Sequence, residues 1–150
     1  MTLGFRLSRR LVAAVALQDD QVVHQDSRYV ARRREAVEGR VSRYFDRLLD
    51  QLSPTTIWYY APTRPEALSE RLTQLLEASA SRHGIPTRQL AAGSLRQALA
   101  LPVRAPRRAI LEHVVPLWPA VANLPRAQQA TFAEAAVVAM TGDIADVLTA

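Results

Sequence analysis

Side chains suited to acid–base or metal chemistry are few and scattered in this sequence. It contains 14 acidic residues, three histidines and no cysteine. His24, His83 and His113 have no carboxylate at ligand spacing, so we expect solvated or capping roles for them. The missing cysteine excludes disulfides, thiolate metal sites and cysteine nucleophiles. A glycine-rich phosphate loop and a Gly-x-Ser-x-Gly elbow are also absent from the sequence.

Arginine is the only abundant residue type whose side chain is suited to binding a charged ligand. All 19 basic residues are arginine, and the formal net charge is +5. Each guanidinium is a planar fork that matches the oxygens of a phosphate. The net positive charge favours a polyanionic partner such as nucleic acid, or an acidic protein surface.

The first predicted elements form a hairpin. Residues 11–17 are a continuous apolar run, polar residues 18–20 follow, and residues 21–24 resume a β-branched pattern. This predicts two strands joined by a tight turn, with residues 27–31 either extending the second strand or forming a third. The run follows Ser8-Arg9-Arg10, a faint twin-arginine pattern, but it is short and lacks a small-residue cleavage site. We therefore interpret it as a buried strand.

The remaining pattern alternates helices and strands and predicts an α/β fold, a mixed sheet with helices on its faces. No apolar run reaches the roughly 18 to 20 residues that span a bilayer, so we expect a cytoplasmic protein. The length of 150 residues suits one domain, which we expect to cover residues 1–150. The expected elements up to residue 92 are a helix over 32–52, an internal strand over 55–60, a helix capped by Thr63 and Glu66 that ends at Gly84, and a weak strand over 85–92. Three helices follow: a short one over 93–99, one through 110–115 closed by Pro116 and Pro119, and one over 130–147 with a kink or break expected at Gly142.

Five segments, in order and nearly without gaps, resemble the RuvC family of Holliday junction resolvases, which have an RNase H-like fold. The resemblance covers nearly the whole chain. Its segments are residues 3–8 running on into 11–17 as the first strand, 53–60 as the central strand, 86–98, the basic loop 104–107, and the alanine-rich stretch 132–139.

The resemblance implies a nuclease site that has lost most of its acids. The family's metal-binding carboxylates correspond to Arg6, Tyr60, Thr131 and Glu134. Two-metal chemistry requires several carboxylates around a pair of Mg²⁺ ions, and neither a guanidinium nor a phenol replaces an aspartate. No acid occurs from residue 1 to 17 or from 54 to 60. We therefore expect no bound metal or cofactor, with Mg²⁺ needed only if the chain is an active nuclease.

Arg6 adds a cation where the family has its first aspartate. Its guanidinium has three open roles: it fills the space of a missing metal, pairs with Glu134, or contacts a phosphate directly. A salt bridge with Glu134 is the expected role.

The resemblance also implies retained contacts to DNA. The family's two DNA-contacting lysines correspond to Arg96 and Arg107, both still cationic. Further arginines expected on the same side are Arg104, Arg108, Arg9, Arg10 and Arg64.

These features support a catalytically inactive protein that binds branched or duplex DNA in recombination or repair. The alternatives are a protein-interaction subunit with the same fold, and an active endonuclease with a site rearranged around Glu134, Asp19 or Asp20. The family's two-fold homodimer is also expected here. The helix carrying Leu68, Leu72, Leu75 and Leu76 is the predicted contact, although packing on its own sheet would explain the same leucines.

Overall fold

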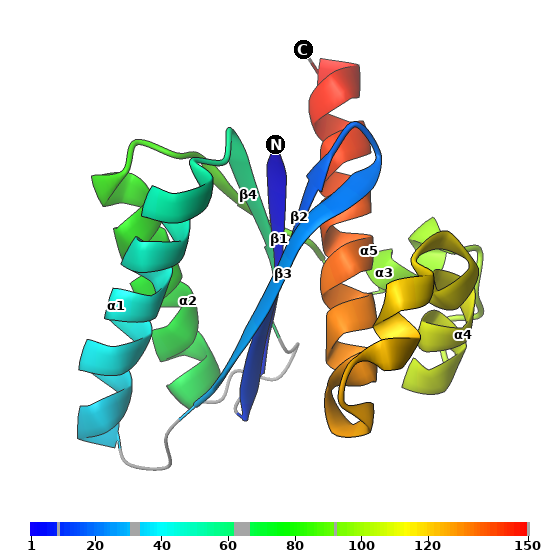
Figure 1. The fold of residues 1–150 in the computed structure, drawn as a ribbon, viewed down its shortest axis with the longest axis horizontal. Coiled ribbons are helices and arrows are strands. Elements are labelled where there is room, and N and C mark those ends of the chain that lie inside the picture. The colour runs from blue at the N-terminus through cyan, green and yellow to red at the C-terminus, as the bar shows by residue number, and fades with distance from the viewer. Residues whose placement is uncertain (9, 31–33, 62–66, 92, 150) are drawn as a thin grey trace.

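A five-stranded sheet separates two groups of helices, as the computed structural model shows in Figure 1. The structure describes residues 1–8, 10–30, 34–61, 67–91 and 93–149. The strands are β1 (Thr2–Leu7), β2 (Leu11–Gln18), β3 (Gln21–Tyr29), β4 (Thr56–Tyr60) and β5 (Thr87–Gln89). The helices are α1 (Arg34–Leu52), α2 (Ala67–Arg82), α3 (Ser94–Ala98), α4 (Arg107–Leu117), the 3₁₀ helix η1 (Pro119–Asn123) and α5 (Arg126–Thr149).

The sheet is mixed, with strand order β3-β2-β1-β4-β5. β1, β2 and β3 are antiparallel neighbours, while β4 pairs in parallel with both β1 and β5. The expected fold class is therefore confirmed. β4 lies between two strands, as its dense β-branched and aromatic sequence predicts.

One expectation about the first strands is wrong. Residues 3–17 do not form one strand: β1 ends at Leu7 and β2 begins at Leu11. The Ser8 hydroxyl stabilises the turn, because it donates to the Leu11 carbonyl at 2.7 Å and accepts from the Leu11 amide at 3.2 Å. The β2–β3 hairpin is confirmed, and β3 extends to residue 29. Asp19 and Asp20, at φ 51° and 62°, form its tight turn.

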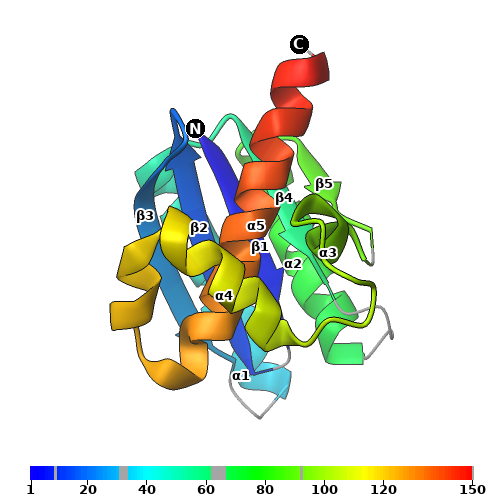
Figure 2. The same ribbon diagram turned by 90° about the vertical axis from the view of Figure 1, so that its right-hand side faces the viewer.

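The helices form two layers (Figures 1 and 2). α1 and α2 cover one face of the sheet, and α5 crosses the other face with α3 and α4 outside it. Pro116 does not end α4 but lies in its last turn. The predicted strand over 85–92 is reduced to β5. The predicted cap at Thr63 and Glu66 lies outside the described residues.

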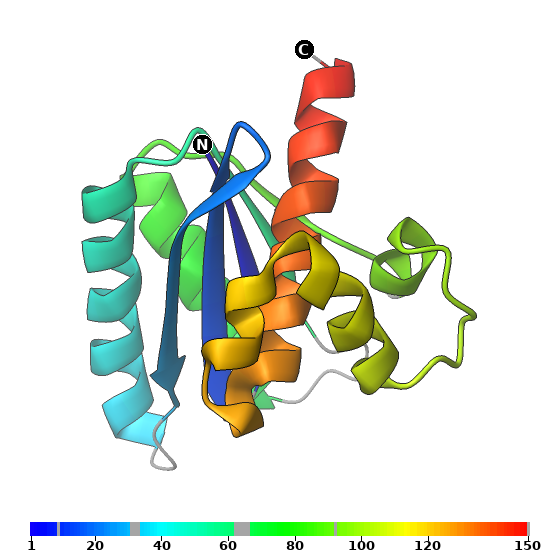
Figure 3. The ribbon, with the colours of Figure 1, turned by 45° about the vertical axis from the view of Figure 1, so that its right-hand side comes forward.

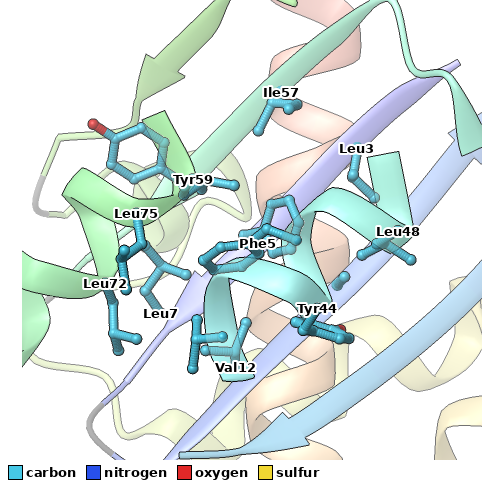
Figure 4. Close-up of a cluster of buried hydrophobic side chains, with 14 of the residues drawn as sticks. Leu3, Phe5, Leu7, Val12, Tyr44, Leu48, Ile57, Tyr59, Leu72 and Leu75 are labelled. Atoms are coloured by element: carbon cyan, nitrogen blue, oxygen red, sulfur yellow. The ribbon is translucent and has the colours of Figure 1, made fainter. Parts of the chain in front are cut away.

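The core between the sheet and α1–α2 is built from alternate strand residues (Figure 4). Phe5 of β1 is fully buried, and its ring meets Phe45 of α1 edge to face at 5.5 Å between centroids. Leu72, Leu75 and Leu76 of α2 are buried in the same cluster, and Leu68 packs against it. These leucines are thus accounted for within the chain and do not by themselves indicate a dimer contact.

The core on the other face depends on a close approach between the sheet and α5. A Cβ atom added to Gly142 would lie 2.3 Å from Cγ of Trp58, and one added to Gly4 would lie 2.5 Å from the Ala139 amide nitrogen. α5 continues through Gly142 to Thr149, so this glycine does not break the helix. Instead it makes room for the Trp58 indole. The last turns of α5 extend past the end of the sheet, as Figure 3 shows.

None of the described helices is long and apolar enough to cross a membrane.

Candidate phosphate-binding site

The site begins with Arg6 at the carboxyl end of β1. Side chains alternate along a strand, so Arg6 points away from the Phe5 core and toward α5. It is paired with Tyr60 in the parallel β1–β4 register, and its guanidinium carbon lies 4.7 Å from the centre of the Tyr60 ring. The side chain is 12% exposed. Its Nη1 donates to the Leu7 carbonyl at 2.5 Å, which fixes the guanidinium at the strand end.

Glu134 of α5 receives an arginine on each carboxylate oxygen. Arg6 Nε lies 3.4 Å from Oε2. Arg107, in the first turn of α4, donates from Nε to Oε1 at 2.8 Å and contacts the same oxygen with Nη2. The glutamate side chain is 4% exposed, so its charge is buried and compensated by two cations. The expected salt bridge between Arg6 and Glu134 is therefore present.

Thr131 completes the group, one helical turn before Glu134. Its hydroxyl oxygen accepts from Arg107 Nη2 at 3.2 Å. The structure thus places Arg6, Tyr60, Thr131 and Glu134 around one point and adds Arg107 to them. The four predicted positions come together because β1 and β4 are neighbouring strands and helix α5 packs across both.

A cavity of about 460 Å³ opens beside this group. Its charged lining is entirely cationic: Arg6, Arg10 and Arg107. Arg10 is exposed and forms no ion pair within the described part of the chain. The remaining lining residues are Ser8, Leu11, Tyr29, Ala127 and Thr131. Glu134 neutralises part of the charge from behind, and the cavity as a whole favours an anion.

Tyr29 and Ser8 were not foreseen as part of this site. Tyr29, at the end of β3, is 64% exposed, and its hydroxyl accepts from Gln128 Nε2 of α5 at 3.0 Å. The available signal was an aromatic residue at the end of a predicted strand. Its contact with α5 depends on a packing that the sequence does not specify.

The other predicted arginines differ in their availability. Arg96 donates from Nε to the Ala105 carbonyl at 2.7 Å, so part of its fork holds the loop before α4. Arg108 is 80% exposed and pairs with Glu112 one turn along α4 at 3.3 Å. Arg104 is exposed. Arg9 and Arg64 lie outside the described residues.

The donor set at this site does not fit a pair of Mg²⁺ ions. Hard divalent cations take several carboxylate or carbonyl oxygens, and two-metal sites need acids that bridge both ions. The group provides one carboxylate, and both of its oxygens face guanidiniums. Throughout the described residues, no three His, Cys, Asp or Glu side chains gather where they would hold a metal.

Comparison with known proteins shows which solved structures share this fold. Against solved structures, the chain matches RuvC of Thermus thermophilus with a TM-score of 0.77 over 99% of this chain and 96% of that one. The chain has a RuvC-type fold. A second structure, T. thermophilus RuvC in complex with a Holliday junction substrate, matches with a TM-score of 0.75 over 98% of this chain and 95% of that chain.

The RuvC-type fold is conserved here with little sequence in common. Identity to the two structures is 14% and 15%. No protein-family model matches the chain, and no curated protein matches it. The likeness therefore establishes the fold, and the chemistry has to be argued from the side chains of this chain.

Proposed function

We propose that this chain is a catalytically inactive RuvC-type protein that binds branched or duplex DNA through the arginine cavity. The observation that carries the proposal is the double pairing of Glu134 with Arg6 and Arg107. It removes the one acid of the group from metal binding and leaves a cavity whose charged walls are guanidiniums. The Holliday junction substrate bound by T. thermophilus RuvC supports DNA as the polyanion.

The proposed role of each residue follows from its exposure. Arg10 is exposed and without an ion pair in the described chain, so it is free to meet a phosphate. Arg107 has a side chain that is 51% exposed and keeps Nη1 outside its contacts with Glu134 and Thr131. Arg6 is mostly buried and serves to hold Glu134 in place. Charge-assisted, forked hydrogen bonds to phosphate are the strongest contacts available to such a group.

Binding without cutting is the chemical consequence. Phosphodiester hydrolysis in two-metal sites needs metal-bound water and metal stabilisation of the leaving oxygen. A guanidinium stabilises phosphate charge but does not activate water as a nucleophile, since it only donates hydrogen bonds and cannot accept a proton from water. In this proposal the protein needs no cofactor and holds the DNA backbone intact.

The proposal includes a cytoplasmic role in recombination or repair and a two-fold homodimer. A dimer would present two copies of the arginine cavity to a four-way junction. Because the α2 leucines are packed within the chain, the contact would use exposed residues of α2.

Salt-dependent binding to a fluorescent four-way junction tests this function. We expect the logarithm of the association constant to fall steeply with the logarithm of salt concentration. Replacing Arg10 and Arg107 by Gln should reduce that slope by about 2, since each phosphate contact contributes about 0.9. Arg71→Gln, on α2, is the control because it removes one partly exposed, ion-paired cation from the opposite face.

Three results would contradict the proposal. A slope unchanged in the double variant would remove the cavity as the DNA site. Absence of salt-dependent binding to junction and duplex alike would favour the protein-interaction subunit, whose basic surface meets an acidic protein. Mg²⁺-dependent nicking of the junction by wild type, lost in Glu134→Gln, would establish an active nuclease.

A further inference from the structure

A second basic cavity lies on the opposite face of the sheet, between α1 and the edge strand β3. Its volume is about 570 Å³. Four arginines line it: Arg28 from β3 and Arg40, Arg43 and Arg47 from α1. It shares no lining residue with the cavity beside Glu134. An inference drawn from it therefore does not depend on the proposed function.

The sequence places these arginines together by two independent periodicities. Residues three and four apart share a helix face, so Arg40, Arg43 and Arg47 follow one stripe of α1. Arg28 is registered opposite Val12 on β2, whose side chain belongs to the core beneath α1 and α2. Arg28 consequently projects from the same face of the sheet, toward the helix. All four arginines are exposed.

Two acids also line the cavity, but both are engaged with α2. Asp46 Oδ1 accepts from the Ser79 hydroxyl at 2.5 Å and from Arg82 Nη2 at 2.9 Å. Asp50 Oδ1 lies 2.8 Å from His83 Nε2. The four arginines form no ion pair within the described residues. Their charge therefore exceeds that of the two aspartates, and the Oδ1 atom of each aspartate already has a hydrogen-bond partner on the other side.

Tyr44 gives the second, independent indication of a ligand. It lines the cavity, is 2% exposed, and its hydroxyl is buried with no hydrogen-bond partner among the described residues. Figure 4 shows its ring at the margin of the core, with the hydroxyl oxygen directed away from Phe5. Buried hydroxyls are nearly always hydrogen-bonded, because an unsatisfied one forfeits its hydration. A ligand oxygen in the cavity would supply the missing partner.

The protonation of Tyr44 suits it to donate. Burial raises the pKa of its phenol well above the usual value, and the nearby Asp26 carboxylate raises it further. The group is thus a neutral O–H donor at any physiological pH. A donor beside four guanidiniums selects an acceptor-rich anion.

We propose that the α1–β3 cavity binds a phosphate group, held by Arg28, Arg40, Arg43 and Arg47 with the Tyr44 hydroxyl as a neutral donor. Its volume leaves room beyond one phosphate group, which suits a nucleotide-sized compound or a polynucleotide backbone. The chemistry of recognition is the same for both sources. The exposed arginine side chains adjust their rotamers around the ligand.

Titration of the whole chain with inorganic phosphate, followed by NMR of the arginine Nε–H groups, tests the site directly. We expect saturable shifts at Arg40, Arg43 and Arg47. Arg43→Gln combined with Arg47→Gln should weaken binding at this cavity by about tenfold or more, and Tyr44→Phe by roughly threefold to tenfold, given the strength of hydrogen bonds to charged groups. Arg71→Gln, which removes a charge elsewhere on the same helical layer, should leave the affinity unchanged.

Tyr44→Phe keeps the fold measurable because it removes a hydroxyl and retains the buried ring. It should unfold at the same or a higher temperature than wild type, since no satisfied hydrogen bond is lost. The inference is overturned if the arginine signals of α1 do not shift with phosphate. It is equally overturned if Tyr44→Phe and the double arginine variant bind phosphate as wild type does.

A duplex oligonucleotide and a mononucleotide separate the two sources. If the site takes a polynucleotide backbone, the double arginine variant lowers the salt slope of duplex binding by about 2 more than Arg71→Gln does. If it takes a small phosphate compound, the variant weakens mononucleotide binding and leaves the duplex slope unchanged. Failure at the Glu134 cavity would appear in the Arg10 and Arg107 variants alone, so the two proposals fail separately.

Discussion

Arg6 and Tyr60 stand side by side across β1 and β4, with the guanidinium carbon 4.7 Å from the centre of the ring. By resemblance, these are the two strand positions where RuvC-type resolvases carry metal-binding acids. Here they form a cation–π contact, and neither side chain offers a carboxylate oxygen to a metal ion. The same guanidinium meets Glu134, so Arg6, Tyr60 and Glu134 act as one unit in which the two charges offset each other.

The first prediction concerns the acid of that unit. Glu134→Gln should tighten junction binding several-fold, because it removes the negative charge behind a cationic cavity. It should also destabilise the fold by about 1–3 kcal/mol, since Arg6 loses its buried partner, and the half-exposed Arg107 limits the loss. Fluorescence anisotropy and guanidinium denaturation measure the two effects.

Glu112→Gln is the control for this variant. Glu112 also pairs with an arginine, but its side chain is 67% exposed. An exposed pair contributes about 0–1 kcal/mol, so we expect little change in stability. Weaker junction binding by Glu134→Gln would contradict the idea that the acid merely balances the arginines.

The second prediction concerns metal affinity. Wild type should not bind Mn²⁺ near Glu134 at micromolar to low-millimolar concentration. A variant combining Arg6→Asp, Tyr60→Glu and Thr131→Asp restores oxygen donors around Glu134 and should gain Mn²⁺ binding, because several carboxylates then converge. Electron paramagnetic resonance of free Mn²⁺ reports both, and circular dichroism checks that the variant folds. Wild-type binding in this range would defeat our account of the site.

Much of the fold could be predicted from pattern alone. The continuous apolar run of β2 and the aromatic β4 specify buried strands, and the apolar stripe of α1 specifies a helix and the face that it buries. The boundary between β1 and β2 could not be predicted this way. Both flanks are apolar, and the turn depends on the Ser8 hydroxyl bonding to Leu11, which no periodicity reveals.

The site was only partly accessible from sequence. The resemblance pointed to Arg6, Tyr60, Thr131 and Glu134 as one group, and the structure places them together. It did not predict that Arg107 would contact Glu134, because that contact depends on how α4 packs against α5, which no periodicity reveals. The α1–β3 cavity was missed altogether. It requires Arg28 of β3 to lie opposite Arg40, Arg43 and Arg47 of α1, and helix periodicity alone does not reveal that pairing.

The third prediction compares two glycines of different surroundings. Gly142→Ala should destabilise the protein by about 2 kcal/mol or more, because the new methyl group overlaps the Trp58 indole and rigid cores do not absorb it. Gly39→Ala, on the exposed part of α1, meets nothing closer than 3.7 Å, the Arg43 guanidinium. It should stabilise α1 by about 0.5–1 kcal/mol through helix propensity. Thermal unfolding distinguishes the two, and equal effects would show that α5 does not pack on β4 as described.

The fourth prediction concerns pH and the junction between α1 and α2. His83 lies 2.7 Å from the Ser79 carbonyl through Nδ1 and 2.8 Å from Asp50 through Nε2. The Ser79 carbonyl first, and the Asp50 carboxylate second, raise the pKa of this histidine above its usual 6.5. A raised pKa means that the folded state binds the proton more tightly than the unfolded state does. The resulting stability is fully present below pH 6.5 and is lost as the pH rises through the folded-state value.

Wild type should therefore lose stability relative to His83→Gln as the pH rises from 6 to 8. Glutamine is the suitable replacement because it retains a polar group at the end of α2 and does not titrate in this range. Chemical denaturation of both proteins at several pH values measures the difference. Asp46 must be followed in the same series, since the Ser79 hydroxyl and Arg82 lower the pKa of its carboxyl and its contribution is lost only in acid. A stability difference between the two proteins that is constant from pH 6 to 8 would show that the histidine is not charged by these contacts.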